Sequence, residues 1–206
     1  MHSIFPFPFN RRQAMAAMVL GLLPRQALAA TKFIGKASDV RGTVVARRNE
    51  NTRSLKSGAG VRLKDSIETE VESFARLDLA GKTRVHLGSH ARLLIDRFVA
   101  ETGGVLELGE GAMLLDRPEK RRKIDLTIRS RFGVIAVRGT RFFAGPSRGA
   151  FGVFVARGTV EVEAAGVTRR LSAGEGVDIP AEGQPPGEVK TWGKARIAEA
   201  LASVGL

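Results

Sequence analysis

The sequence predicts an all-β fold, which is a sandwich, a roll or a solenoid-like stack of short antiparallel strands, followed by a short C-terminal helix. Runs such as Ile124–Arg129 and Val160–Glu163 alternate apolar with polar residues, the period of a strand with one buried face. Glycine-rich turns separate these runs at intervals of about ten residues, which is typical of all-β domains. A chain of 206 residues is long enough for about one domain with its own core.

The first 29 residues have the layout of a cleaved signal peptide. Arg11 and Arg12 precede an apolar run over 14–23, and small residues around Ala29 supply a cleavage site. The run is shorter than the roughly 20 residues that a membrane-spanning helix needs. We therefore expect export, cleavage near Ala29 and a periplasmic protein without a transmembrane anchor. The arginine pair also matches part of a twin-arginine signal, so the general secretory and twin-arginine routes both remain open.

The composition of the exported part excludes some kinds of chemistry. The chain has no cysteine, which excludes disulfides and thiol nucleophiles. Its formal charge is +12, and loss of three arginines with the signal peptide, which has no acidic residue, leaves +9. The mature protein is therefore still strongly basic.

The tripeptide Arg-Gly-Thr occurs three times, at 41–43, 138–140 and 157–159. The second copy lies in the most distinctive stretch of the chain, Phe132–Phe143. Glycine tolerates a positive φ angle or a bulge, and threonine favours re-entry into a strand. We expect each copy to form a strand, a kink at the glycine and a second strand.

The chain changes character at Pro180. Residues 181–206 begin with a proline- and glycine-rich linker, in which no strand ladder can continue. The alanine-rich segment Val189–Val204 then predicts a helix. We expect this helix to cover an open end of the β domain over 31–180, together with its edge strands. The alternative is a helix that binds a partner.

Several segments resemble, in order, the FecR-type periplasmic domain family. The most specific part of the family pattern lies in Gly133–Phe142, and its signature residues are Val137, Arg138, Gly139, Thr140 and Phe142. The resemblance extends from about Asp39 to Ile179. The segments that carry it are Glu72–Leu79, Leu87–Leu93, Gly133–Phe142, Val155–Val162 and Leu171–Val177.

The resemblance implies a non-enzymatic module. The best-known members are inner-membrane regulators whose cytoplasmic segment engages a sigma factor and whose periplasmic domain contacts a TonB-dependent transducer. The sequence shows neither that segment nor a membrane span. We therefore expect a stand-alone exported member, a binding or signal-relay module of the bacterial envelope that acts by protein–protein contact.

A basic run supports a second hypothesis, a structural protein that binds polysaccharide or lipopolysaccharide in the envelope. Its cations form a patch that would attract an anionic envelope polymer, more weakly as salt rises. Nucleic acid is not expected as a partner, because the protein is exported and no aromatic residues are interleaved. A solvated loop is the simpler interpretation. The residues of the run are Arg117, Lys120, Arg121, Arg122 and Lys123.

Arg138 has two interpretations. An arginine in an apolar strand must reach solvent or bond to carboxylates and carbonyls, because an unpaired buried charge costs several kcal/mol. We expect Arg138, and with it Arg41 and Arg157, to clamp neighbouring turns from the inside. The alternative is that Arg138 contacts a partner directly.

Three motifs that could suggest catalysis or ligand binding have structural interpretations. Ser147 stands in a Gly-x-Ser-x-Gly pattern, but a strand pattern follows it and no histidine occurs after His90, so we expect a turn residue. His86 and His90 are flanked by strand-like alternation, and no metal site is expected. The segment Ser57–Gly60 is expected to be a turn and not a phosphate loop. We expect no catalytic residues, no cofactor and no enzymatic activity.

Overall fold

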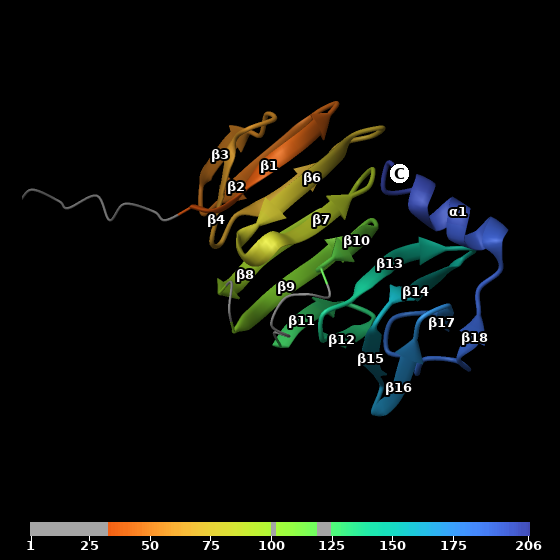
Figure 1. Cartoon of the computed structure of the whole chain (residues 1–206). Coiled ribbons are helices and arrows are strands. Elements are labelled where there is room, and N and C mark those ends of the chain that lie inside the picture. The colour runs from red at the N-terminus through yellow and green to blue at the C-terminus, as the bar shows by residue number, and fades with distance from the viewer. Residues whose placement is uncertain (1–32, 100–101, 119–124) are drawn as a thin grey trace, which may run out of the picture. The chain divides into compact units, whose positions relative to one another are not determined.

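The computed structural model describes residues 33–99, 102–118 and 125–206, and its strands form two nine-stranded sheets (Figure 1). Sheet A has the order β18 (Lys190–Thr191), β17 (Glu175–Ile179), β14 (Ala150–Arg157), β13 (Arg141–Ser147), β10 (Met113–Asp116), β7 (Thr83–Leu87), β6 (Phe74–Leu79), β1 (Phe33–Arg41) and β4 (Gly60–Arg62). Sheet B has the order β16 (Val167–Ser172), β15 (Thr159–Ala164), β12 (Gly133–Val137), β11 (Asp125–Ser130), β9 (Gly103–Glu110), β8 (Arg92–Val99), β5 (Ser66–Thr69), β2 (Val44–Arg48) and β3 (Asn51–Ser54). A 3-10 turn spans Ala80–Lys82, and helix α1 spans Lys194–Ala202.

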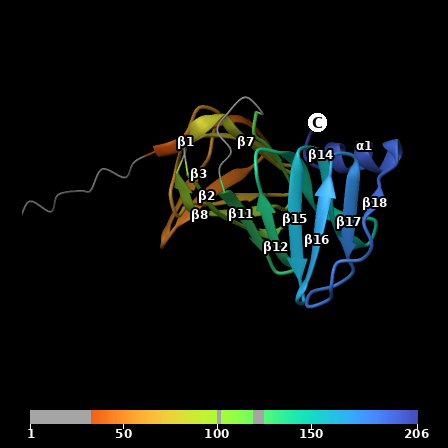
Figure 2. The ribbon, with the colours of Figure 1, turned by 60° about the horizontal axis from the view of Figure 1, so that its bottom comes forward.

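The chain alternates between the sheets, mostly one hairpin at a time. From β6 onward, two strands enter sheet A, two enter sheet B, and β10 returns to sheet A before the next pair. Among the strands that the structure describes, β9 pairs with β11 in parallel, and the other pairings are antiparallel. Figure 2 shows the later hairpins side by side, with β12, β15 and β16 in one layer. The prediction of an all-β fold of antiparallel strands with a C-terminal helix is confirmed.

Alternating side chains from both sheets fill the main core. Every second residue of β6 is buried, and the same pattern appears in β11 and β15. The inward side chains pack in one cluster, and burial of apolar surface contributes about 25 cal/mol per Å². Fully buried members from the two sheets include Leu77, Val85, Phe142, Leu106, Ile128 and Val162.

Each Arg-Gly-Thr copy forms a corner at which the chain leaves one sheet for the other. The first links β1 to β2, the second β12 to β13, and the third β14 to β15. The glycines Gly42, Gly139 and Gly158 have φ angles of +76°, +65° and +86°, in the left-handed region that only glycine adopts readily. The predicted kink between two strands is confirmed at all three positions.

The structure of the C-terminal segment after Pro180 differs from the prediction. Sheet A resumes after the linker, because β18 pairs with β17. The helix is therefore shorter than predicted, and it covers the outer face of central strands of sheet A, not the edge strands. The reason is a row of apolar side chains on that face, Leu114, Phe143 and Phe154, paired across β10, β13 and β14.

Trp192 and α1 cover this apolar row. The Trp192 ring stacks on Phe154 with centroids 5.2 Å apart, and Ala200 and Val204 complete the cluster. The guanidinium of Arg196 lies 3.7 Å from the centroid of the Trp192 ring and donates to Asp178. No helix within the described ranges has the length and apolar character needed to cross a membrane. The predicted signal peptide, 1–29, lies outside the described residues.

Candidate functional site

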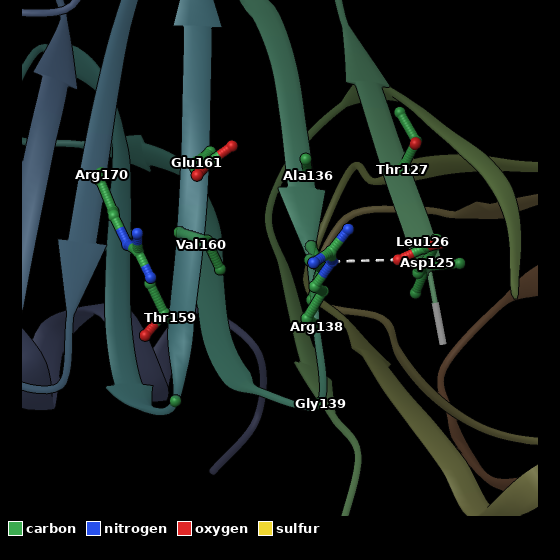
Figure 3. Close-up of a pocket in the computed structure, with 12 residues that line it drawn as sticks. Asp125, Leu126, Thr127, Ala136, Arg138, Gly139, Thr159, Val160, Glu161 and Arg170 are labelled. Carbon is green, nitrogen blue, oxygen red and sulfur yellow. Dashed lines mark hydrogen bonds and ion pairs between the residues drawn. The ribbon is translucent and has the colours of Figure 1, made fainter. Parts of the chain in front are cut away.

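A depression of about 750 Å³ lies on the outer face of sheet B (Figure 3). Strands β11, β12, β15 and β16 contribute its walls and floor, and two of the Arg-Gly-Thr corners border it. The polar side chains that line it are Asp125, Thr127, Arg138, Thr159, Glu161 and Arg170.

The strand register explains why the surface is hollow here. Thr127 lies opposite Ala136, Ala136 lies opposite Glu161, and Glu161 lies opposite Arg170. Cross-strand neighbours on one face stand about 5 Å apart. The small exposed side chain of Ala136 therefore forms a floor between longer neighbours.

Arg138 stands at the rim of this depression. Its Nε donates to Asp125 Oδ1 at 3.1 Å, and the two side chains are 75% and 79% exposed. An exposed pair of this kind contributes about 0–1 kcal/mol to stability. The expectation that Arg138 clamps the fold from the inside is therefore wrong, since this residue faces solvent.

The three equivalent arginines have different surroundings. Arg138 directly follows β12, a strand of sheet B. Arg41 and Arg157 are the last residues of β1 and β14, which are strands of sheet A. Arg157 Nη2 donates to Asp116 Oδ1 at 2.9 Å and to the Arg117 carbonyl at 2.8 Å, as a clamp would. Arg41 is 63% exposed and pairs with Asp39 at 3.3 Å, so the clamp expectation is also wrong for Arg41.

The other signature residues lie inside the domain or form its backbone turn. Val137 is 3% exposed, and Thr140 and Phe142 are fully buried. Gly139 supplies the left-handed turn. Arg138 is thus the signature side chain that reaches the surface.

The basic run does not form the predicted patch as a whole. Arg117 is only 4% exposed, and its Nη1 donates to Thr83 Oγ1 at 2.8 Å. It is part of the interior, and assigning it to a surface patch was wrong. Lys120, Arg121, Arg122 and Lys123 lie outside the described residues, and their role stays a prediction.

The remaining motifs lie in turns and strands. Ser147 is the last residue of β13 and pairs with Ala150 of β14 across a two-residue turn, so it lies in a strand directly before the turn and not, as predicted, in the turn itself. The predicted turn at Ser57–Gly60 is confirmed, with Gly58 at a φ of +87°. His86 lies on β7 and His90 in the turn after it. The described part of the chain contains no cluster of three or more potential metal ligands.

His86 has an unusual electrostatic environment on the outer face of sheet A. Its partial burial and the nearby guanidinium groups of Arg76, Arg84 and Arg141 lower its pKa to about 4. The imidazole is therefore uncharged at neutral pH. At the level of the sequence, His86 is considered only as a candidate metal ligand and is rejected as one, and this arginine cluster is missed, because the cluster forms across strands.

The fold and the depression together define a two-sheet β domain with an exposed, mixed-charge surface. Residues 65–161 match the family described as FecR protein. The match includes the second and third corners but is shorter than the resemblance from Asp39 to Ile179. A comparison with curated proteins finds no match.

Two solved structures share the fold. Both are crystal structures of a candidate anti-sigma factor from Parabacteroides distasonis, at 1.65 and 2.50 Å resolution, and each superposes with a TM-score of 0.53 at 20% identity. The alignments cover 66% of this chain and 64% and 63% of the neighbours, so the chain spans just under two thirds of their length.

Proposed function

We propose that this chain is a signal-relay module of the bacterial envelope that acts by binding another protein over the depression at Arg138. The FecR match supports a regulatory role and not an enzymatic one. A structural neighbour described as a candidate anti-sigma factor is in keeping with that role.

The exposure of Arg138 carries the proposal. Its neighbours in the signature are buried or form the turn, whereas its guanidinium stands at the rim of a hollow with 75% of the side chain exposed. The exposed ion pair with Asp125 contributes little to stability, so the fold gives no strong reason for an arginine here. Arginine is enriched among residues that dominate binding at protein interfaces, since it forms forked hydrogen bonds and stacks on aromatic rings.

The proposed location of this contact is the periplasm. The support comes from the signal-peptide layout of the first 29 residues, with cleavage near Ala29. The proposed partner is a protein of the envelope that presents groups complementary to two cations and two carboxylates around an alanine floor.

Site-specific photo-crosslinking in intact cells tests the proposal. A photoreactive amino acid replaces Ala136 on the floor of the depression, and the same replacement at Arg47 is the control. Arg47 is an exposed residue of β2 on the same sheet. We expect a discrete crosslinked protein from position 136 and none from position 47. Equal crosslinking from both positions, or none from position 136, would contradict the proposal.

A further inference from the structure

The outer face of sheet A carries a second charged surface, opposite in the fold to the depression. Two adjacent cross-strand rows define it, and we call them the charged row and the mixed row. The charged row is Lys36, Asp78, Arg84, Asp116, Arg141 and Arg157. The mixed row is Asp39, Arg76 and His86, and it continues into the apolar residues Leu114, Phe143 and Phe154 that are covered by Trp192 and α1.

The acidic residues of this surface already have partners. Asp78 pairs with Arg84 at 3.4 Å, Asp39 with Arg41 at 3.3 Å, and Asp116 with Arg157 at 2.9 Å. Asp116 also faces Arg141 across the strands, but its carboxylate bonds to Arg157.

Three cations remain without a carboxylate partner among the described residues: Lys36, Arg76 and Arg141. Arg76 donates through Nε to the Ser38 hydroxyl at 2.9 Å, a neutral acceptor. Arg76 and Arg141 are both partly buried, so solvent screens their charges less than those of fully exposed arginines. The surface therefore has a surplus of positive charge, and the hydrogen bond to Ser38 holds the Arg76 guanidinium in place.

His86 lies between these arginines and adds no charge of its own. Partial burial lowers its pKa most, and the positive charges of Arg76, Arg84 and Arg141 lower it further. A hollow of about 40 Å³ opens beside His86, lined by Arg41, Arg76, Phe74, the segment 204–206 that follows α1, and Asp39, whose carboxylate pairs with Arg41. This volume exceeds the roughly 10–15 Å³ that one water needs, and it can hold a carboxylate group with an apolar neighbour against Phe74.

We propose that this face docks an acidic segment of a partner protein, with carboxylates on Arg76 and Arg141. Three strand-to-strand steps of about 14 Å separate β6 from β13, and the two arginines are offset by two residues, about 7 Å, along the strands, so their Cα atoms lie about 16 Å apart. Carboxylates four residues apart in an extended segment lie on the same side at roughly 13 Å, a spacing that the two long arginine side chains can meet. This surface is distinct from the depression at Arg138 and goes beyond the function proposed above.

The aspartates favour a protein segment over a continuous polyanion. A phosphate-rich polymer or membrane surface would bring negative charge against Asp39, Asp78 and Asp116 as well as against the arginines. An acidic peptide can place its carboxylates at the two arginines and uncharged residues elsewhere, so it avoids this repulsion.

Fluorescence anisotropy with labelled peptides tests this proposal on the folded chain. The probe is an extended, threonine- and valine-rich peptide with two glutamates four residues apart. The comparison peptides have the two glutamates two residues apart or replaced by glutamine. We expect saturable binding of the probe, and binding about tenfold weaker or worse for both comparison peptides, the effect of losing one charge-assisted contact.

Matched variants locate the binding. Arg76→Gln and Arg141→Gln should each weaken the probe about tenfold, whereas Arg129→Gln, an exposed arginine of sheet B, should not. If a variant fails to fold, the proposal is still tested by comparing the binding of the probe and of the comparison peptides to the unaltered chain. Equal binding of all peptides, an equal effect of Arg129→Gln, or binding of phosphatidylglycerol vesicles in place of the probe would overturn the proposal.

Discussion

The Cγ2 methyl of Thr140 lies against Gly158, 2.6 Å from the position that a β carbon on this glycine would occupy. The second and third Arg-Gly-Thr corners therefore pack directly on one another. This contact joins two points at which the chain crosses between sheets A and B, and it lies beside the depression that carries Arg138.

Gly158→Ala should destabilise the domain more than Gly174→Ala. The two glycines have φ angles of +86° and +87°, but a β carbon at Gly174 would meet nothing within 4 Å. Both variants carry a backbone cost of about 1–2 kcal/mol, and only Gly158→Ala adds the clash with Thr140. Urea unfolding measures the difference. Equal losses would show that the corner contact does not constrain the fold.

Arg157→Met and Arg138→Met should differ in their effect on stability. Arg157 donates to Asp116 and to a backbone carbonyl, so its loss should cost about 1–3 kcal/mol of unfolding free energy. Loss of the exposed Arg138 should change that free energy by less than about 0.5 kcal/mol. The measurement is again urea unfolding, and the reverse order would contradict the assignment of clamp and surface roles.

Arg196→Ala should loosen the C-terminal helix. Arg196 lies over Trp192 and bonds to Asp178 and Ser147, which fixes α1 on the outer face of sheet A. Trp192 is the single tryptophan of the chain, so quenching of its fluorescence by iodide reports on this contact. We expect stronger quenching in Arg196→Ala.

Arg148→Ala is the matched control for the helix. Arg148 also bridges to the helix, through Glu199 at 2.8 Å, but both side chains are more than half exposed. This variant should leave the quenching of Trp192 near that of the unaltered chain. Equal quenching in the two variants would show that Arg196 does not hold the helix in place.

The pKa of His86 should be measurable at about 4 by an NMR titration of its imidazole resonances. The unfolded chain would take up this proton near pH 6.5, before the folded chain does. His86 therefore lowers stability as the pH falls from about 6.5 to 4. Arg76→Gln should raise the pKa, because a positive neighbour is removed. A titration near pH 6.5 in the unaltered chain would contradict the described environment.

The strands and corners could be predicted because their signals are local. Alternation in Asp125–Ser130 and Thr159–Ala164 reports one buried face, and each glycine of the three repeats marks its own kink. The sheet to which each strand belongs depends on pairings with strands that are distant in the sequence. The same tripeptide therefore points one arginine outward from sheet B and another into contacts on sheet A.

The helix position and the burial of Arg117 depend on contacts between distant segments. Arg117 bonds to Thr83, which lies 34 residues away, and no run of neighbouring cations reveals such a partner. One signal for the helix was available. The apolar run at Met113–Leu115 is buried on both faces, and continuous apolar strands of this kind indicate that both sides of a sheet are covered.

The most direct test of the proposed function is the yield of the crosslink from position 136 in an Arg138→Glu background, compared with an Arg47→Glu background. We predict that Arg138→Glu reduces the yield about tenfold or more, since charge reversal at a central contact opposes binding. Arg47→Glu should leave the yield unchanged. An undiminished crosslink in a folded Arg138→Glu protein would contradict the assignment of the depression as the partner-binding surface.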